Sequence, residues 1–235
     1  MLDPDFTIVE SARAEATGYS FPSGHTQNAV GTFGGIARAT KRHCLRWVCV
    51  VIFVLVSFSR MYLGVHTPLD VGVSFVIAAV LVFAIYPLMR RADRYPRLMA
   101  GLLASMVLLS AAYLTFTLVY PFPPDIDSAN LASGVENGWK LLGATLGIAL
   151  AWWLDRQYVR FETKAVWWVQ AIKFIVGLAL VVALKAGLKA PLIALFGGSA
   201  GPAGAVRYFL VVLAAGVLWP MAFRPLSRLG QRGEG

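Results

Sequence analysis

Long apolar stretches alternate with short polar segments along almost the whole of this 235-residue chain. An α-helix needs about 17 to 25 apolar residues to cross a bilayer, and seven stretches are long enough to do so. They cover residues 24–40, 43–59, 68–89, 98–120, 139–155, 165–187 and 203–222. The pattern therefore predicts an all-α protein, a polytopic membrane bundle of about seven transmembrane helices.

The first of these stretches is the least apolar, because it contains Gly31, Gly34 and Gly35. The spacing Gly31-x-x-x-Gly35 is one that lets membrane helices pack closely. We therefore expect a helix buried in the bundle. The alternative is a glycine-rich loop at the membrane surface.

The composition supports a membrane protein and excludes two other classes. Hydrophobic residues make up 58% of the chain and charged residues 14%, and the mean hydropathy is +0.67. Soluble domains carry about 25% charged residues, and disordered chains combine low hydrophobicity with high charge. The net charge of +9 is expected to encode orientation in the membrane, so no nucleic-acid partner is predicted.

Basic residues gather at alternate ends of consecutive stretches, as the positive-inside rule requires of cytoplasmic loops. Four groups hold 14 of the 21 Lys and Arg residues: Arg38, Lys41, Arg42 and Arg46; Arg90, Arg91, Arg94 and Arg97; Arg156, Arg160 and Lys164; and Arg224, Arg228 and Arg232. Residues 1–23 and the loops 60–67, 121–138 and 188–202 then lie outside. We expect a multi-pass protein of the cell membrane with a cytoplasmic C-terminus.

One ionisable side chain, Lys173, lies within the sixth stretch, close to Gln170. An ionisable residue inside a membrane segment is a functional candidate by default. Lys173 is only about two and a half turns from the cytoplasmic end, however, so partial snorkelling or a structural hydrogen bond is the favoured interpretation.

Polar residues able to do chemistry concentrate in two segments on the outer side, each leading into a helix. The first segment, residues 18–26, reads GYSFPSGHT. Here Pro22 and Ser23 predict a turn with Ser23 as the helix cap. Gly24 has no side chain, so the backbone N–H groups around it are open to an anion.

The second segment, residues 59–70, reads SRMYLGVHTPLD. Thr67 is a good N-cap, and Pro68 suits the first helical position. His66 then precedes the helix and Asp70 lies in its first turn. The four-residue separation lets the carboxylate reach the imidazole and fix its tautomer and orientation.

Together these side chains suit phosphoryl transfer. Arg60 can bind phosphate oxygens, while Ser23 and the N–H groups near Gly24 complete the cradle. One imidazole can attack phosphorus while the other protonates the leaving oxygen. The few acidic residues form no dense set of oxygen ligands, so neither a metal site nor a cofactor is predicted.

The two segments resemble the second and third signature motifs of the type 2 phosphatidic acid phosphatase (PAP2) family, lipid phosphatases related to vanadium haloperoxidases. Pro22-Ser23-Gly24-His25 resembles the second motif, and Ser59-Arg60-x5-His66-x3-Asp70 resembles the third. The resemblance covers about residues 18–89. It implies an integral membrane phosphatase that hydrolyses a lipid phosphate or diphosphate, of phosphatidic acid or isoprenyl diphosphate type, at the extracytoplasmic face.

The resemblance also implies a role for each residue. His66 would be the nucleophile that forms a phosphohistidine, Asp70 its orienting partner, and His25 the general acid that protonates the leaving group. The phosphate-binding residues would be Arg60, Ser23 and Gly24. Hydrolysis would need no metal.

One departure from the family pattern is the first motif, Lys-x6-Arg-Pro, which supplies two further phosphate-binding bases. The 21 residues before Pro22 contain only Arg13 as a base, so we expect a chain that is truncated at its N-terminus. Two charge-assisted contacts, each on the order of 1.5 to 3 kcal/mol, correspond to roughly 10² to 10⁴ in transition-state binding. The chain itself is then expected to be weakly active or inactive.

The sequence divides into three parts. Residues 1–89 form a catalytic core lacking its N-terminal part, residues 98–223 form additional transmembrane helices, and residues 224–235 form a cytoplasmic basic tail.

The alternative function is a non-catalytic multispan protein, a transporter or scaffold, that has kept a vestigial site. Another enzyme interpretation keeps the site but takes a soluble phosphoester or, with vanadate bound, a halide. The expected partners are a lipid phosphate and membrane lipids, and the sequence predicts no oligomeric state. Candidates for substrate choice in the outer loops are Tyr62, Lys140, Lys185, Lys189 and Arg207.

Overall fold

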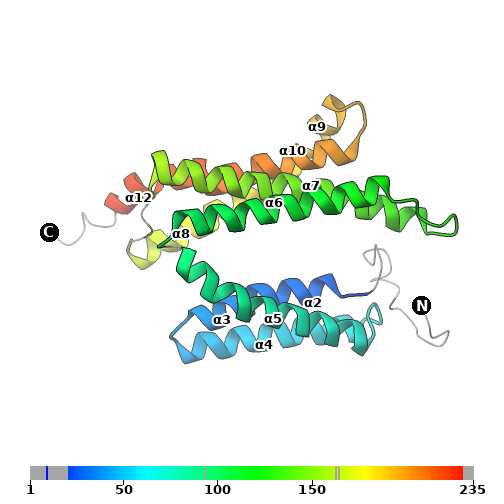
Figure 1. The fold of residues 1–235 in the computed structure, drawn as a ribbon. Helices are drawn as coiled ribbons and strands as arrows, with labels where there is room; N and C mark the ends of the chain where they lie inside the picture. Colours follow the sequence, from blue (N-terminus) through cyan, green and yellow to red (C-terminus); the bar gives the residue numbers. More distant parts are fainter. Residues whose placement is uncertain (1–8, 10–20, 93, 162, 164, 230–235) are drawn as a thin grey trace. The chain divides into compact units, whose positions relative to one another are not determined.

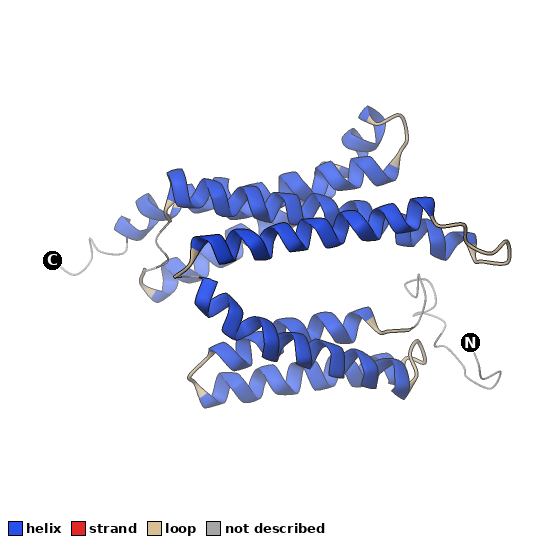
Figure 2. Ribbon diagram, viewed as in Figure 1, coloured by secondary structure: helices blue, strands red, loops and turns tan. Residues whose placement is uncertain are grey.

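The computed structural model describes residues 9, 21–92, 94–161, 163 and 165–229. These residues form helices and connecting loops, with no strand among them (Figure 2). They divide into two compact units whose boundary falls between Met99 and Ala100. The predicted all-α class is therefore confirmed.

Unit 1 is a small bundle in which the first predicted stretch packs on the next two (Figure 1). Its elements are α2 (Gly24–Ala29), the π-helical turn η1 (Val30–Gly34), α3 (Gly35–Ala39), α4 (His43–Tyr62) and α5 (Pro68–Ala92). Because α2, η1 and α3 follow one another without interruption, the first stretch is a helix and not a glycine-rich loop.

The glycines of this first stretch do not make the close helix contact that their spacing predicts. A Cβ added to Gly31 or Gly35 would meet no atom within 4 Å. Both glycines instead line a mainly apolar groove of about 470 Å³ with residues of α5, including Ala78 and Val82. The absence of side chains thus opens space between the helices here and does not bring their backbones together.

Unit 2 contains the remaining helices, with α6 beginning just before the boundary. They are α6 (Pro96–Val119), α7 (Ser128–Leu154), η2 (Asp155–Val159), α8 (Trp167–Gly187), α9 (Lys189–Leu195), α10 (Ala200–Leu213), η3 (Ala214–Leu218), α11 (Trp219–Met221) and α12 (Phe223–Leu229). The main contact within the unit is between α7 and α10.

Two buried glycines of α7 set the distance between α7 and α10. A Cβ on Gly143 would lie 2.0 Å from the carbonyl oxygen of Ala205, and one on Gly147 would lie 2.9 Å from Cβ of Val212. No side chain fits at the first position without moving a backbone. Small-residue contacts of this kind drive helix association in membranes, where apolar burial supplies little.

Gly143→Ala is expected to destabilise unit 2 by about 1 to 3 kcal/mol, because the added methyl group overlaps the Ala205 carbonyl. Gly101→Ala in α6 is the matched control, since a Cβ there meets nothing within 4 Å. The better helix propensity of alanine should stabilise that variant slightly. Thermal unfolding in detergent measures both effects, and midpoints that rise equally in the two variants would contradict the proposed contact.

Among the described residues, five helices are long and apolar enough to cross a membrane: His43–Tyr62, Pro68–Ala92, Pro96–Val119, Trp167–Leu195 and Ala200–Met221. They correspond to five of the seven predicted spans. The other two predicted spans are also helical, but 24–39 is short, and glycines and polar residues lower the hydropathy of α7. Large apolar side chains such as Leu109, 70% exposed, cover the spans where lipid would surround them.

The favoured structural interpretation of Lys173 is confirmed. Its side chain is buried, and Nζ donates a hydrogen bond of 2.9 Å to Ser227 Oγ. The ammonium also lies 4.6 Å from the centroid of the Phe223 ring. Lys173 therefore holds the C-terminal helix α12 against α8.

Candidate active site

The first sequence segment forms the capped beginning of α2. Ser23 is the N-cap, and its Oγ accepts hydrogen bonds from the Thr26 N–H at 3.4 Å and from Thr26 Oγ1 at 3.1 Å. Both side chains are completely buried. The predicted cap is therefore present, and it fixes the backbone at the start of the helix. Residues 18–20 of the segment lie outside the described residues.

Gly24 is the first residue of α2 and is exposed. A Cβ at this position would meet no atom within 4 Å, so the first turn of the helix faces open space. The following residue, His25, is exposed as well. A group carrying negative charge can approach this turn, where the helix dipole and the first N–H groups favour an anion.

The second segment leads from the end of α4 to the beginning of α5. Arg60 lies in the last turn of α4, where it is partly buried and its Nε donates to Ser59 Oγ at 3.5 Å. Gly64 has a φ of 69°, a left-handed conformation that glycine adopts without strain. The chain reverses there, so that His66 follows and α5 begins at Pro68.

Thr67 and Asp70 cap α5 reciprocally. The Asp70 carboxylate oxygen Oδ2 accepts from the Thr67 N–H at 2.7 Å, and Thr67 Oγ1 accepts from the Asp70 N–H at 3.2 Å. This is the geometry of a capping box with an aspartate at its third helical position. The Asp70 side chain is thereby held in one orientation, with only 8% of it exposed.

The same carboxylate oxygen lies 3.8 Å from Nδ1 of His66. That distance is too long for a hydrogen bond, and Nδ1 is buried without a hydrogen-bond partner. Asp70 and His66 are thus neighbours, as predicted, but the hydrogen bond between the carboxylate and the imidazole is not formed. A buried nitrogen left unpaired is costly.

A backbone contact joins the two segments. The Ser23 N–H donates to the carbonyl oxygen of Asp70 at 3.5 Å, and the same oxygen accepts from the buried hydroxyl of Ser74 at 2.7 Å. The beginning of α2, the end of α4 and the beginning of α5 therefore lie at one end of unit 1 (Figure 1). This end carries all six residues that the sequence proposes for the site: Ser23, Gly24, His25, Arg60, His66 and Asp70.

The contact between Ser23 and Asp70 is one that the sequence does not indicate, because it uses backbone atoms only. Among the described residues, no three His, Cys, Asp or Glu side chains lie close enough together to hold a metal ion. The six site residues supply two imidazoles, one carboxylate, one guanidinium and the hydroxyl of Ser23.

Fold and site together define an integral membrane protein with a histidine–aspartate pair and a capped, open helix start at one end of a helical unit. Residues 2–94 match the PAP2 superfamily, and residues 139–232 match a family described as PAP2 superfamily phosphatase, transmembrane extension. The chain belongs to the PAP2 superfamily.

Among curated proteins, undecaprenyl-diphosphatase BcrC of Bacillus subtilis (strain 168) is 36% identical to this chain over 67 residues. The aligned region is 28% of this chain and 34% of the relative, so the chain spans about a third of the length of that protein. No solved structure matches the chain.

Proposed function

We propose that this protein is a membrane phosphatase that hydrolyses a lipid phosphate or diphosphate, with His66 as the nucleophile. The observation that carries the proposal is that Asp70 contacts both segments of the site. Its carbonyl binds the Ser23 N–H, and its carboxylate lies 3.8 Å from His66 Nδ1. Membership in the PAP2 superfamily and a relative named as an undecaprenyl-diphosphatase support it.

In the first step, His66 attacks the phosphorus atom of the substrate. Because Asp70 lies on the Nδ1 side of the ring, Nε2 is the nitrogen available for the attack. The Nε2–P bond forms as the bond between phosphorus and the leaving oxygen breaks, and that oxygen takes the bonding electrons. His25 donates a proton to it, which releases a neutral alcohol or a protonated phosphate.

In the second step, water attacks the phosphohistidine. His25, now neutral, accepts a proton from the water as its oxygen bonds to phosphorus. The N–P bond breaks, its electron pair returns to Nε2, and inorganic phosphate leaves. Both histidines then regain their starting states, so the cycle consumes one water molecule per phosphate released and needs no other reactant.

Arg60 and the start of α2 bind the transferred phosphoryl group in this proposal. A guanidinium matches two phosphate oxygens at once, and charge on the equatorial oxygens is stabilised by N–H donors at a helix start. Ser23 holds that helix start in place through its cap. Gly24 leaves the approach open because it has no side chain.

The positions of the bases support an extracytoplasmic site. The loop that carries His66 lies between two spans whose other ends bear Arg42 and Arg46 on one side and Arg90 and Arg91 on the other. Basic ends are typical of the cytoplasmic side. By the same rule, the bases that follow the last span support a cytoplasmic C-terminus.

The function is tested by phosphate release from phosphatidic acid, an isoprenyl diphosphate and p-nitrophenyl phosphate, with the purified chain in detergent. His25→Gln is expected to slow the first step on phosphatidic acid by roughly 10² to 10⁴, measured as leaving-group release in the first turnover. That step should slow far less on p-nitrophenyl phosphate, whose leaving group needs no proton, whereas the second step, which also uses His25, should slow equally for both substrates. Equal slowing of the first step on both substrates would rule out His25 as the general acid, and no release from any substrate by the parent chain would contradict an active phosphatase.

Gly24→Ala is expected to lower kcat/KM by about tenfold or more while leaving the unfolding midpoint nearly unchanged. The added methyl group meets no protein atom, so it costs no packing, but it occupies the space proposed for phosphate. Gly101→Ala, whose methyl group also enters open space, is the control and should keep full activity. Unchanged kcat/KM in Gly24→Ala would contradict phosphate binding at this turn.

A further inference from the structure

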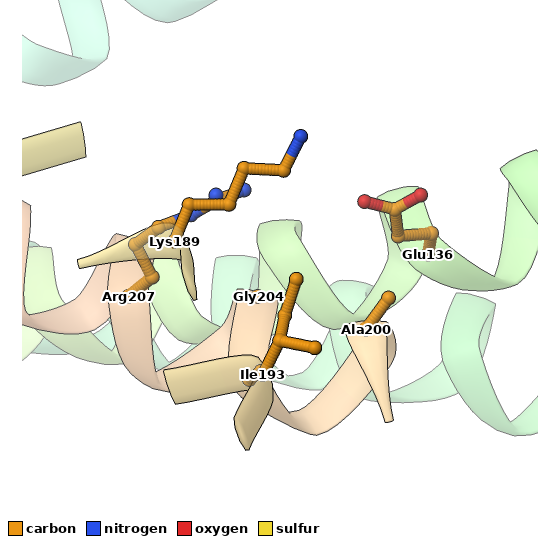
Figure 3. Close-up of a pocket in the computed structure, with 7 residues that line it drawn as sticks. Glu136, Lys189, Ile193, Ala200, Gly204 and Arg207 are labelled. Atoms are coloured by element: carbon orange, nitrogen blue, oxygen red, sulfur yellow. The ribbon is translucent and has the colours of Figure 1, made fainter. Parts of the chain in front are cut away.

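A small cavity of about 170 Å³, lined by both charged and apolar residues, lies within unit 2, away from the residues of the proposed active site in sequence. Its charged lining residues are Glu136 of α7, Lys189 of α9 and Arg207 of α10, and small residues of α10 such as Gly204 form part of its wall. Figure 3 shows the side chains of Lys189 and Arg207 next to each other, with the Glu136 carboxylate across from them.

Arg207 is the unusual member of this group. It lies within a membrane-spanning helix, seven residues after the first residue of α10, which is about two turns. Only 8% of the residue is exposed, and its buried Nε has no hydrogen-bond partner. A guanidinium inside a membrane span is costly and is retained where it pairs with a partner. Within the part of the chain that the structure describes, no such partner reaches Nε.

The only carboxylate of the cavity lining is already engaged. Glu136 Oε1 lies 2.8 Å from Nζ of Lys140. The stem of Lys140 in turn packs near Gly204, where an added Cβ would lie 3.4 Å from Lys140 Cγ. Because Lys140 balances Glu136, no carboxylate among the described residues pairs with Lys189 or Arg207, and the guanidinium of Arg207 has only the ring of Tyr208 beside it, 5.5 Å from the ring centroid.

A helix start adds to this positive character. α10 begins at Ala200, which lines the cavity, and its N-cap Ser199 makes no side-chain capping bond. The first N–H groups of an α-helix lack intrahelical partners, and the helix dipole places partial positive charge there. The cavity therefore combines a buried guanidinium, an ammonium and an uncapped helix start.

We propose that this cavity binds a phosphate group, as free phosphate or as the phosphodiester of a phospholipid headgroup. Arg207 would bind two of its oxygens through the guanidinium, and Lys189, exposed at the rim, would neutralise a further charge. The site lies on other helices than His66 and does not depend on the proposed phosphatase activity. It also gives a role to three residues that the sequence leaves without a pattern: Lys140, Lys189 and Arg207.

Binding is tested with the full chain in phosphatidylcholine nanodiscs. The probes are inorganic phosphate in solution and phosphatidylglycerol in the disc, whose phosphodiester is not a monoester substrate. Native mass spectrometry and the unfolding midpoint report binding. We expect at least one probe to bind and to raise the midpoint, and Arg207→Gln to weaken that binding about tenfold or more. Binding of phosphate alone identifies the free anion, and binding of phosphatidylglycerol alone identifies a headgroup.

Two further variants make the test specific. Lys189→Gln changes an exposed side chain, so it should fold normally and weaken binding several-fold even if Arg207→Gln fails to fold. Lys185→Gln is the matched control, because Lys185 lies in the last turn of α8 and does not line the cavity. The proposal is wrong if neither probe binds, if Lys189→Gln binds as the parent chain does, or if Lys185→Gln weakens binding equally.

Discussion

Replacing His66 with alanine is expected to remove phosphate release from a lipid phosphate, a loss of roughly 10³-fold or more. Alanine offers no nitrogen for the N–P bond, and the remaining groups of the site can only bind the phosphate and protonate the leaving oxygen. The assay is release of inorganic phosphate from phosphatidic acid in detergent micelles. An alkaline quench with a ³²P-labelled substrate should also trap phosphohistidine in the parent chain and none in the variant.

The chain offers a close control for this experiment. His43 is the only other histidine outside the proposed site, and it begins α4 at the end opposite Arg60. It is exposed, so His43→Ala should fold and release phosphate as the parent chain does. If His66→Ala releases phosphate at the parent rate, His66 is not the nucleophile and the proposed mechanism fails.

The second large effect is expected at Asp70. Asp70→Asn should lower kcat by roughly 10² to 10⁴ with little change in KM, because an amide does not stabilise the imidazole ring as a carboxylate does. An asparagine oxygen can still accept the hydrogen bond that Thr67 N–H gives to Asp70 Oδ2. The cap of α5 should therefore survive, and the unfolding midpoint should change little.

Thr67→Ala separates the two roles of Asp70. It removes the hydroxyl that accepts from the Asp70 N–H, at a cost of about 1 kcal/mol in stability, and leaves the carboxylate beside His66. We expect Thr67→Ala to keep its kcat and Asp70→Glu to recover part of the lost activity. Equal reductions of kcat in Thr67→Ala and Asp70→Asn would mean that Asp70 acts only as a cap.

The sequence predicts the helices well where apolar residues are continuous, and less well where helices extend into water. Residues 121–138 are expected as a loop, yet α7 begins at Ser128, with Asp127 accepting from the N–H groups of Ala129 and Asn130. Hydropathy detects the apolar part of a helix, which lipid covers. It does not detect a polar first half such as that of α7. The capping sequence at Asp127 is the signal that indicates the true start.

The sequence predicts which residues form the site but not the distances between them. Spacing places Asp70 one turn from His66, and the two are neighbours, but the carboxylate bonds the Thr67 N–H instead of the imidazole. A backbone donor next to the carboxylate competes with the ring, and residue spacing does not show which one wins. The sequence does not predict the hydrogen bond from the Ser23 N–H to the Asp70 carbonyl oxygen either, because any residue other than proline supplies the same N–H.

The cavity of unit 2 is a third feature that the sequence does not predict. Lys140, Lys189 and Arg207 are far apart in sequence and share no motif, so charge alone gives no reason to group them. They come together because glycines let α7 and α10 approach closely, as at Gly143 and Ala205. Such a contact depends on which faces of two helices meet, which a single sequence does not specify.

The contact at Gly143 also fixes how α10 can move. The carbonyl oxygen of Ala205 lies only 2.0 Å from the position that a Cβ on Gly143 would take. Sliding α10 by one residue along α7 would therefore drive neighbouring side chains into backbone. Arg207 is only two residues beyond Ala205, and Glu136 is two turns before Gly143 on α7. When the bilayer thins or thickens, the two helices should therefore tilt as one body, with the register between Arg207 and Glu136 kept constant.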